Sequence, residues 1–130
     1  MQNKITPSEF IKSSLVTESR DMSPVSNRLQ NNGTVRLLHS MIGLCTESGE
    51  IQDMMKKHIF YGKDIDKVNL KEELGDLMWY IAIACDEIDI SLEEVMQTNV
   101  DKLRARYGEK FTEEAALNRN LLKEREILEK

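Results

Sequence analysis

Apolar residues recur every three to four positions along most of this 130-residue chain, which is the repeat of an amphipathic helix. The pattern predicts an all-α protein, a bundle of four to five helices. Residues 19–32 are polar and contain Pro24, so we expect a loop there with room for one helical turn. The helices are expected at about residues 7–18, 34–58, 70–88, 91–107 and 111 to the C-terminus.

Local signals mark three of the helix starts. Thr6 and Glu9 have the spacing of a capping box, in which each residue satisfies a backbone N–H of the other. Ser91 and Glu94 repeat that spacing before the fourth helix. Asn69 is expected to cap the third helix, because asparagine is a favoured N-cap residue.

The third helix is apolar on nearly all sides between residues 77 and 85, including Trp79 and Ile83 on the side away from its main stripe. Such a helix must be covered on more than one face. A chain of four or five helices has few elements left to do this. We therefore expect a homo-oligomer that forms through the third helix.

Two acidic pairs lie within the second and third helices. Glu47 and Glu50 are three residues apart, and so are Glu73 and Asp76, so each pair points two carboxylates to one side of its helix. If the helices pack together, four carboxylates repel more strongly as the local dielectric falls, and a cation must compensate. Ligands that offer only oxygen favour a hard divalent ion, Mg²⁺ first and Mn²⁺ next.

A solvated helix face is the ordinary explanation for a single acidic pair, since charged residues are mostly exposed. Glu73 and Asp76, however, border the apolar stripe of a mostly buried helix. An unneutralised carboxylate is costly in that position. The two pairs together therefore favour a metal site.

Three motifs in order resemble one known family. Residues 43–50 (GLCTESGE), 72–80 (EELGDLMWY) and 99–107 (NVDKLRARY) are similar to the motifs of the MazG-like all-α nucleoside triphosphate pyrophosphohydrolases. The resemblance covers about residues 33–112 of a chain that we take as a single domain. It implies hydrolysis of an NTP or dNTP to the monophosphate and pyrophosphate, and dimers or dimers of dimers.

This hypothesis assigns roles to the acidic residues. Glu47, Glu50, Glu73 and Asp76 would hold two or three Mg²⁺ ions, one of which lowers the pKa of a water that attacks the α-phosphorus. Glu50 is our choice for the general base that takes the proton of the water, and Glu47 is the alternative. The spacing of the residues does not separate the two.

A polar face on the fourth helix supplies candidate substrate contacts. Asn99 falls within its apolar stripe, and Lys102 and Arg106 follow at the edge of the same face. Asn99 either ties two helices together or reaches the acidic site with Lys102 and Arg106; the resemblance favours the second role for Asn99 and Lys102. Tyr107 either stacks on a sugar or base or covers the core. Gly108 stands where proline often follows the Arg-Tyr of the motif.

Net charge and hydropathy limit the kinds of partner that we expect for this protein. A formal net charge of −5 argues against a nucleic-acid duplex as the main partner. The longest apolar run, residues 77–85, is too short to cross a bilayer, so we expect no membrane partner and a cytoplasmic location. Cys45 and Cys85 lie in apolar helical patterns and are expected to be buried thiols, with a disulfide as the weaker alternative.

The residues that other metal and phosphate-binding sites require are missing from the sequence. A di-iron bundle needs Glu three residues before His, but Arg36 precedes His39 and Met55 precedes His58 at that spacing. No P-loop is present to bind phosphates with backbone amides. A triphosphate must therefore be bound by metal ions and cationic side chains.

Two alternative functions remain open at this stage. The same carboxylates could serve a regulator that binds a cation or nucleotide without turnover. The chain could also be a plain helical oligomerisation module with acidic pairs on its surface.

Two glycines, Gly43 and Gly49, lie inside the second helix, where each costs about 1 kcal/mol relative to alanine. Either a ligand or a neighbouring helix comes close to the backbone there, or the glycines serve simple helix packing.

Overall fold

The computed structural model describes residues 4–129, and within this range the regular structure is entirely helical. The expected all-α class is confirmed, but the described residues form seven helices where the apolar pattern predicts four to five. None of the helices found there is long and apolar enough to cross a membrane. The helices are α1 (Pro7–Thr17), α2 (Ser23–Arg28), α3 (Asn32–Tyr61), α4 (Lys67–Glu87), α5 (Leu92–Tyr107), α6 (Glu113–Leu117) and α7 (Leu121–Leu128).

The chain divides into two compact units, the first ending at Val35 and the second beginning at Arg36. In the first unit, α1 starts with the expected capping box: the Glu9 N–H donates to Thr6 Oγ1 over 3.3 Å, and the Thr6 N–H donates to Glu9 Oε2 over 2.8 Å. The short helix α2 is the helical turn for which the polar loop had room.

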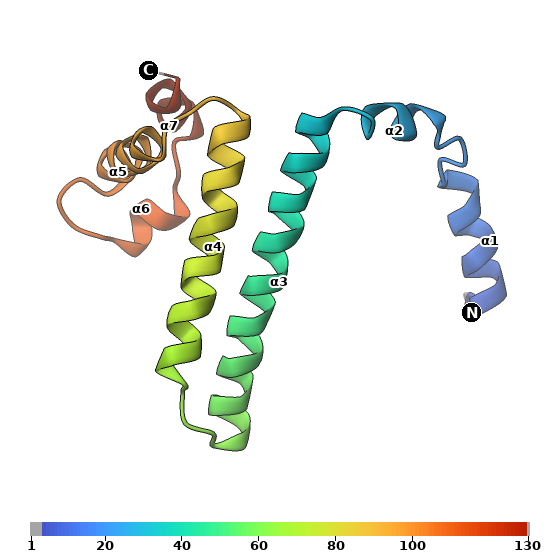
Figure 1. Ribbon diagram of the computed structural model, residues 1–130, viewed down its shortest axis with the longest axis horizontal. Helices are drawn as coiled ribbons and strands as arrows, with labels where there is room; N and C mark the ends of the chain where they lie inside the picture. The colour runs from blue at the N-terminus through green and yellow to red at the C-terminus, as the bar shows by residue number, and fades with distance from the viewer. Residues whose placement is uncertain (1–3, 130) are drawn as a thin grey trace. The chain divides into compact units, whose positions relative to one another are not determined.

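In the second unit, α3 and α4 form an antiparallel helical hairpin (Figure 1). The turn between them contains Gly62, whose φ of 68° is a left-handed conformation that glycine adopts at little cost. At the other end of the hairpin, the Arg36 guanidinium pairs with Asp86 over 2.5 Å and with Glu87 over 3.0 Å. One end of the hairpin is therefore closed by the turn at Gly62, and the other end is held by ion pairs between α3 and α4.

The start of α4 differs from the expectation. Asp66, and not Asn69, is the N-cap, and its carboxylate accepts from the N–H groups of Val68 and Asn69 over 3.0 and 3.1 Å. Asn69 consequently lies inside the helix, where its side chain is free to bond elsewhere. The prediction of Asn69 as a cap was wrong because an aspartate three residues earlier satisfies the same backbone donors.

The helices α5, α6 and α7 gather near the C-terminal end of α4 (Figure 1). As expected, the Ser91 hydroxyl caps α5 by accepting from the Glu94 N–H over 3.0 Å, and α5 ends at Gly108, with φ 65°. The last helix was expected to be continuous, but it is broken between α6 and α7. The Asn120 side chain accepts from the Lys123 N–H over 3.0 Å and so starts α7 as a new helix.

Few apolar side chains are buried within the described part of one chain. Cys85, 8% exposed, is the buried apolar residue, and Cys45 is exposed, contrary to the expectation of two buried thiols. Both cysteines are free, so the disulfide alternative is excluded. Along α4, the side chains of Leu74, Met78 and Trp79 are 51%, 61% and 56% exposed.

Candidate metal centre

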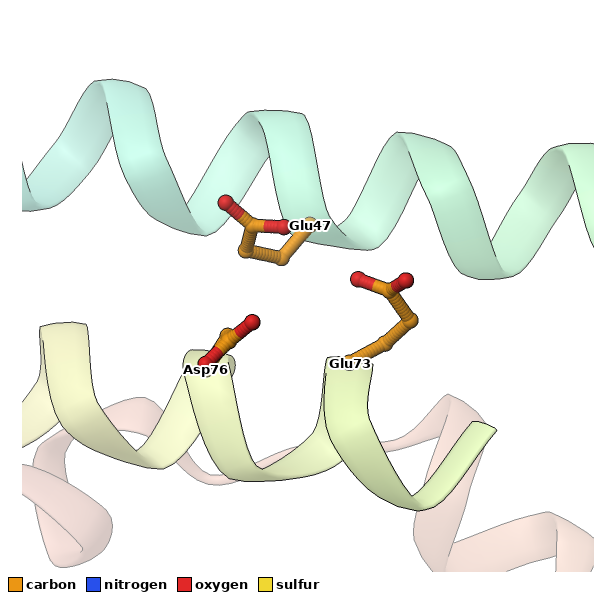
Figure 2. Close-up of side chains that lie close together, drawn as sticks. All are labelled: Glu47, Glu73 and Asp76. Carbon is orange, nitrogen blue, oxygen red and sulfur yellow. The ribbon is translucent and has the colours of Figure 1, made fainter. Parts of the chain in front are cut away.

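Three carboxylates converge between α3 and α4. Glu47 projects from α3, and Glu73 and Asp76 project from α4 into the same space (Figure 2). One oxygen from each of the three groups lies within 4.8 Å of the other two. Glu47 of the first pair therefore faces both members of the second pair across the hairpin, whereas Glu50, which the sequence hypothesis placed with them, is not among the three converging groups.

Glu73 is the buried member of this group, with 4% of its surface exposed. Its Oε1 accepts a hydrogen bond from the Asn69 side-chain amide over 2.7 Å. Asn69 precedes Glu73 by one helical turn, so the same helix supplies both groups. Sequence reasoning missed this contact because it assigned Asn69 to the cap, although the four-residue spacing could have revealed it.

Glu50 lies beside the three converging carboxylates. Its pKa is raised above the ordinary value, chiefly by the negative charge of Glu73, with further contributions from burial and from Glu47. The raised pKa shows that the ionised form of Glu50 is disfavoured by its acidic neighbours. The four carboxylates thus form one electrostatically coupled group, and a cation would relieve their repulsion.

The packing of the hairpin explains why the acids meet. Gly43 is buried on α3, and a Cβ added to it would come within 3.0 Å of the Tyr80 ring on α4. The Tyr80 ring also meets His39 edge to face, with centroids 5.6 Å apart. Gly43 therefore serves helix packing, whereas a Cβ on Gly49 would meet nothing within 4 Å.

The donor set fits a hard divalent cation. All of the converging ligand atoms are carboxylate oxygens. At Mg–O distances of about 2.1 Å, oxygens around an octahedral ion lie roughly 3 to 4.2 Å apart. The separations of up to 4.8 Å need only a small inward movement to reach that geometry. The cluster could therefore hold a metal ion.

Asn99 and Lys102 lie apart from the three converging carboxylates. Both line a largely apolar cavity of about 570 Å³ between α4, α5 and α7, together with Ile81 and Leu128. Lys102 is half-buried, but Asn99 is exposed, so its predicted position within the core of the chain was wrong. The polar groups that line this cavity thus include the side chains of Asn99 and Lys102.

Arg106 is engaged by α7. Its Nε and Nη2 donate to the two oxygens of the buried Glu124 over 2.8 and 2.6 Å, and Arg119 Nη2 donates to Glu124 over 2.7 Å. The two arginines lower the pKa of Glu124 to about 2, chiefly through hydrogen bonding from Arg106. The structure therefore places Arg106 in an ion pair, and nothing in the sequence pattern had indicated Glu124 as its partner.

Tyr107 packs at the end of α5. Its ring centroid lies 5.2 Å from that of Phe111, and the Arg106 guanidinium lies 5.5 Å from the Tyr107 centroid. These contacts show how the last turn of α5 is covered. They do not bring Tyr107 to the carboxylates of α3 and α4.

Comparisons with known proteins gave a relative and a family match. Gene 37 protein of Mycobacterium phage L5 is 39% identical over 75 residues, which cover 54% of this chain and 65% of the phage protein. No solved structure matches the chain. The family model described as the MazG nucleotide pyrophosphohydrolase domain matches residues 37–111, a range that contains all four acids and the polar face of α5. This match confirms the resemblance seen in the sequence: the chain belongs to the MazG nucleotide pyrophosphohydrolase family.

Proposed function

We propose that this protein hydrolyses a nucleoside or deoxynucleoside triphosphate to the monophosphate and pyrophosphate, by attack of water on the α-phosphorus in a reaction that depends on Mg²⁺ or Mn²⁺. The observation that carries the proposal is the convergence of Glu47, Glu73 and Asp76 within 4.8 Å, inside the region that matches the family. A hydrolase of this kind needs such a cluster, because the chain lacks a P-loop.

The roles of the four acids follow from their surroundings. Glu47, Glu73 and Asp76, with Glu50 beside them, would bind the two or three divalent ions, and the Asn69 amide would hold Glu73 in its binding orientation. When bound, the ions would neutralise the phosphates and lower the pKa of water. Glu50 remains our choice for the general base, with Glu47 as the alternative, because Glu50 lies beside the converging carboxylates and lines an adjoining cleft.

The remaining substrate contacts are proposed from the sequence motif. Lys102 and Asn99 would contact the nucleotide from the cavity beside α5. Arg106 would have to release Glu124 before it could hold the nucleotide, because its guanidinium is held by two hydrogen bonds in the structure. Tyr107 would stack on a sugar or base only if its contact with Phe111 opened.

We further propose that the protein acts as a homodimer or a dimer of dimers that forms through α4. A single chain leaves Leu74, Met78 and Trp79 half exposed or more on this helix. Burying apolar surface stabilises by about 25 cal/mol per Å², so a second copy that covers these side chains would be bound favourably. This interface would also sit close to the acidic group on the same helix.

A panel assay tests the function. The full chain is incubated with each canonical and common non-canonical triphosphate in Mg²⁺ or Mn²⁺, and monophosphate and pyrophosphate are measured. We expect equal amounts of the two products for at least one substrate, with none in excess EDTA. Thermal stabilisation by metal without product would favour the binding regulator. A melting temperature indifferent to Mg²⁺, again without product, would favour the oligomerisation module.

A further inference from the structure

A cleft of about 530 Å³ continues from the acidic group toward the turn of the α3–α4 hairpin. Glu50 lines the end nearest the other acids, and Lys57 and Lys63 line the end nearest the turn. Seven residues of helix separate Glu50 from Lys57, a rise of about 10 Å. The cleft therefore leads from the candidate metal ligands to two cations.

Some of the charged side chains that line the cleft already have partners within the described part of the chain, and others do not. Asp53 is bound by Lys56 over 2.7 Å and by Lys57 over 2.5 Å, which leaves its carboxylate neutralised. Asp66 is occupied as the N-cap of α4. Asp64 also lines the cleft, so four carboxylates face two lysines there, and a polyphosphate would have to enter as its complex with a divalent cation. Lys63 has no carboxylate within 4.0 Å among residues 4–129, so its ammonium group is available to an anion that enters the cleft.

The backbone at Lys63 is well positioned for this role. Its N–H donates to the Lys57 carbonyl over 3.2 Å, and its own carbonyl lies 2.9 Å from His58 Nδ1. These bonds fix the turn against the last residues of α3. The exposed lysine side chain thus starts from a held backbone at the edge of the cleft, beside Lys57.

Gly49 keeps the wall of the cleft open next to Glu50. A Cβ at this position would meet no atom of the chain within 4 Å, although glycine within a helix costs about 1 kcal/mol relative to alanine. Packing against the rest of the chain does not explain this glycine. The open space at Gly49 leaves room for a ligand close to the α3 backbone.

We propose that this cleft is the subsite for the β- and γ-phosphates of the substrate, with Lys63 as the principal cationic contact and Lys57 as the second. The proposal rests on the proposed function, because it takes the α-phosphate to lie at the four carboxylates. It gives the substrate a direction: the terminal phosphates extend toward the hairpin turn, and the nucleoside extends toward the opposite end of the hairpin, where Tyr80 lies.

Inorganic tripolyphosphate tests the subsite without requiring turnover. Its binding to the full chain in Mg²⁺ is measured by calorimetry for the wild type, Lys63→Ala and Lys57→Ala, with inorganic orthophosphate as the comparison ligand. We expect Lys63→Ala to weaken tripolyphosphate binding about tenfold, the loss typical of one charge-assisted contact, and to leave orthophosphate binding unchanged. Lys57→Ala should have a smaller effect, because Asp53 already shares its charge.

Lys56→Ala is the matched control. Lys56 lies on the same turn of α3, has a similar exposure of 53% against 47% for Lys57, and also pairs with Asp53, but it does not line the cleft. An equal loss of tripolyphosphate binding in Lys56→Ala and Lys63→Ala would overturn the subsite, since it would show a general charge effect. Unchanged binding in Lys63→Ala, or no binding by the wild type, would overturn it as well.

The experiments can refute the phosphate subsite and the proposed hydrolysis independently of each other. If the wild type hydrolyses triphosphates while Lys63→Ala binds tripolyphosphate normally, the hydrolysis stands and the subsite is wrong. If Lys63→Ala weakens tripolyphosphate binding but the wild type releases no pyrophosphate from any nucleotide, the subsite stands and the hydrolysis is wrong. For an active enzyme, Lys63→Ala should also lower kcat/KM for a triphosphate more than for the matching diphosphate.

Discussion

The Tyr80 ring occupies the space that a side chain at Gly43 would need. This contact sets the register of the antiparallel hairpin. Four residues forward along α3 from Gly43 is Glu47, and four residues back along α4 from Tyr80 is Asp76. One turn of each helix therefore carries the register from the packing contact to the carboxylates, which meet within 4.8 Å.

Gly43→Ala should destabilise the protein. The added methyl group would overlap the Tyr80 ring, and overpacking of this kind costs about 1–3 kcal/mol. Gly49→Ala is the matched control on the same helix, where the added methyl group is unobstructed. Without ligand, it should stabilise by up to about 1 kcal/mol. Denaturant unfolding of both variants measures the two signs, and an equal gain in both would refute the role of Tyr80 in setting the register.

Glu50→Gln should stabilise the metal-free protein at neutral pH and low salt. The pKa of Glu50 is raised, chiefly by Glu73, so ionisation of Glu50 reduces the stability of the folded state as the pH rises through that pKa. The neutral amide removes this repulsion. Thermal unfolding in EDTA should show a higher Tm for the variant, together with a smaller increase when Mg²⁺ is added. A lower Tm in EDTA would contradict the electrostatic account.

Glu124 should contribute stability that depends on pH. Its pKa is lowered from 4.5 to about 2, so the contribution is complete above the ordinary value and is lost as the pH falls from about 4.5 toward 2. The difference in free energy of unfolding between the wild type and Glu124→Gln should be largest near neutral pH and shrink over that range. A difference that is constant with pH would show that the ion pair with Arg106 adds nothing.

Met78→Glu should dissociate the proposed oligomer. Met78 is 61% exposed on the apolar part of α4, and a charge buried in an interface there would be costly. Val68→Glu is the control, because Val68 is 79% exposed on the same helix but lies before the apolar stretch. Light scattering should give the monomer mass for Met78→Glu and the wild-type mass for Val68→Glu. A monomeric wild type would remove the proposed interface.

Helical spacing predicted which residues share a face, and this was enough to find the acidic pairs and most of the helices. It could not predict the register between α3 and α4, because register depends on how Gly43 accommodates Tyr80. The Asn69 amide was missed for a related reason: asparagine suits both a cap and an intrahelical contact, and only the presence of Asp66 at the cap separates the two.

The C-terminal region was the least predictable. The break between α6 and α7 depends on Asn120 capping the new helix, and an asparagine inside a charged segment is a weak signal on its own. The pairing of Arg106 with Glu124 links residues 18 apart, from α5 to α7 with α6 between them in the chain. Cys45 has an apolar pattern around it, yet it is exposed in a single chain. Burial in a helical oligomer depends on the partner as well as on the pattern.

Product release by Glu73→Gln shows whether the converging carboxylates carry the hydrolysis. Glutamine keeps the shape of the side chain and can still accept from Asn69, but it removes the charge needed to bind a cation. Pyrophosphate and monophosphate are measured for the wild type and the variant in Mg²⁺, with circular dichroism to confirm folding. If the carboxylates bind the catalytic ions, we expect equal release of both products by the wild type and a loss of about 100-fold or more in the folded variant. Turnover by Glu73→Gln at the wild-type rate would contradict this role.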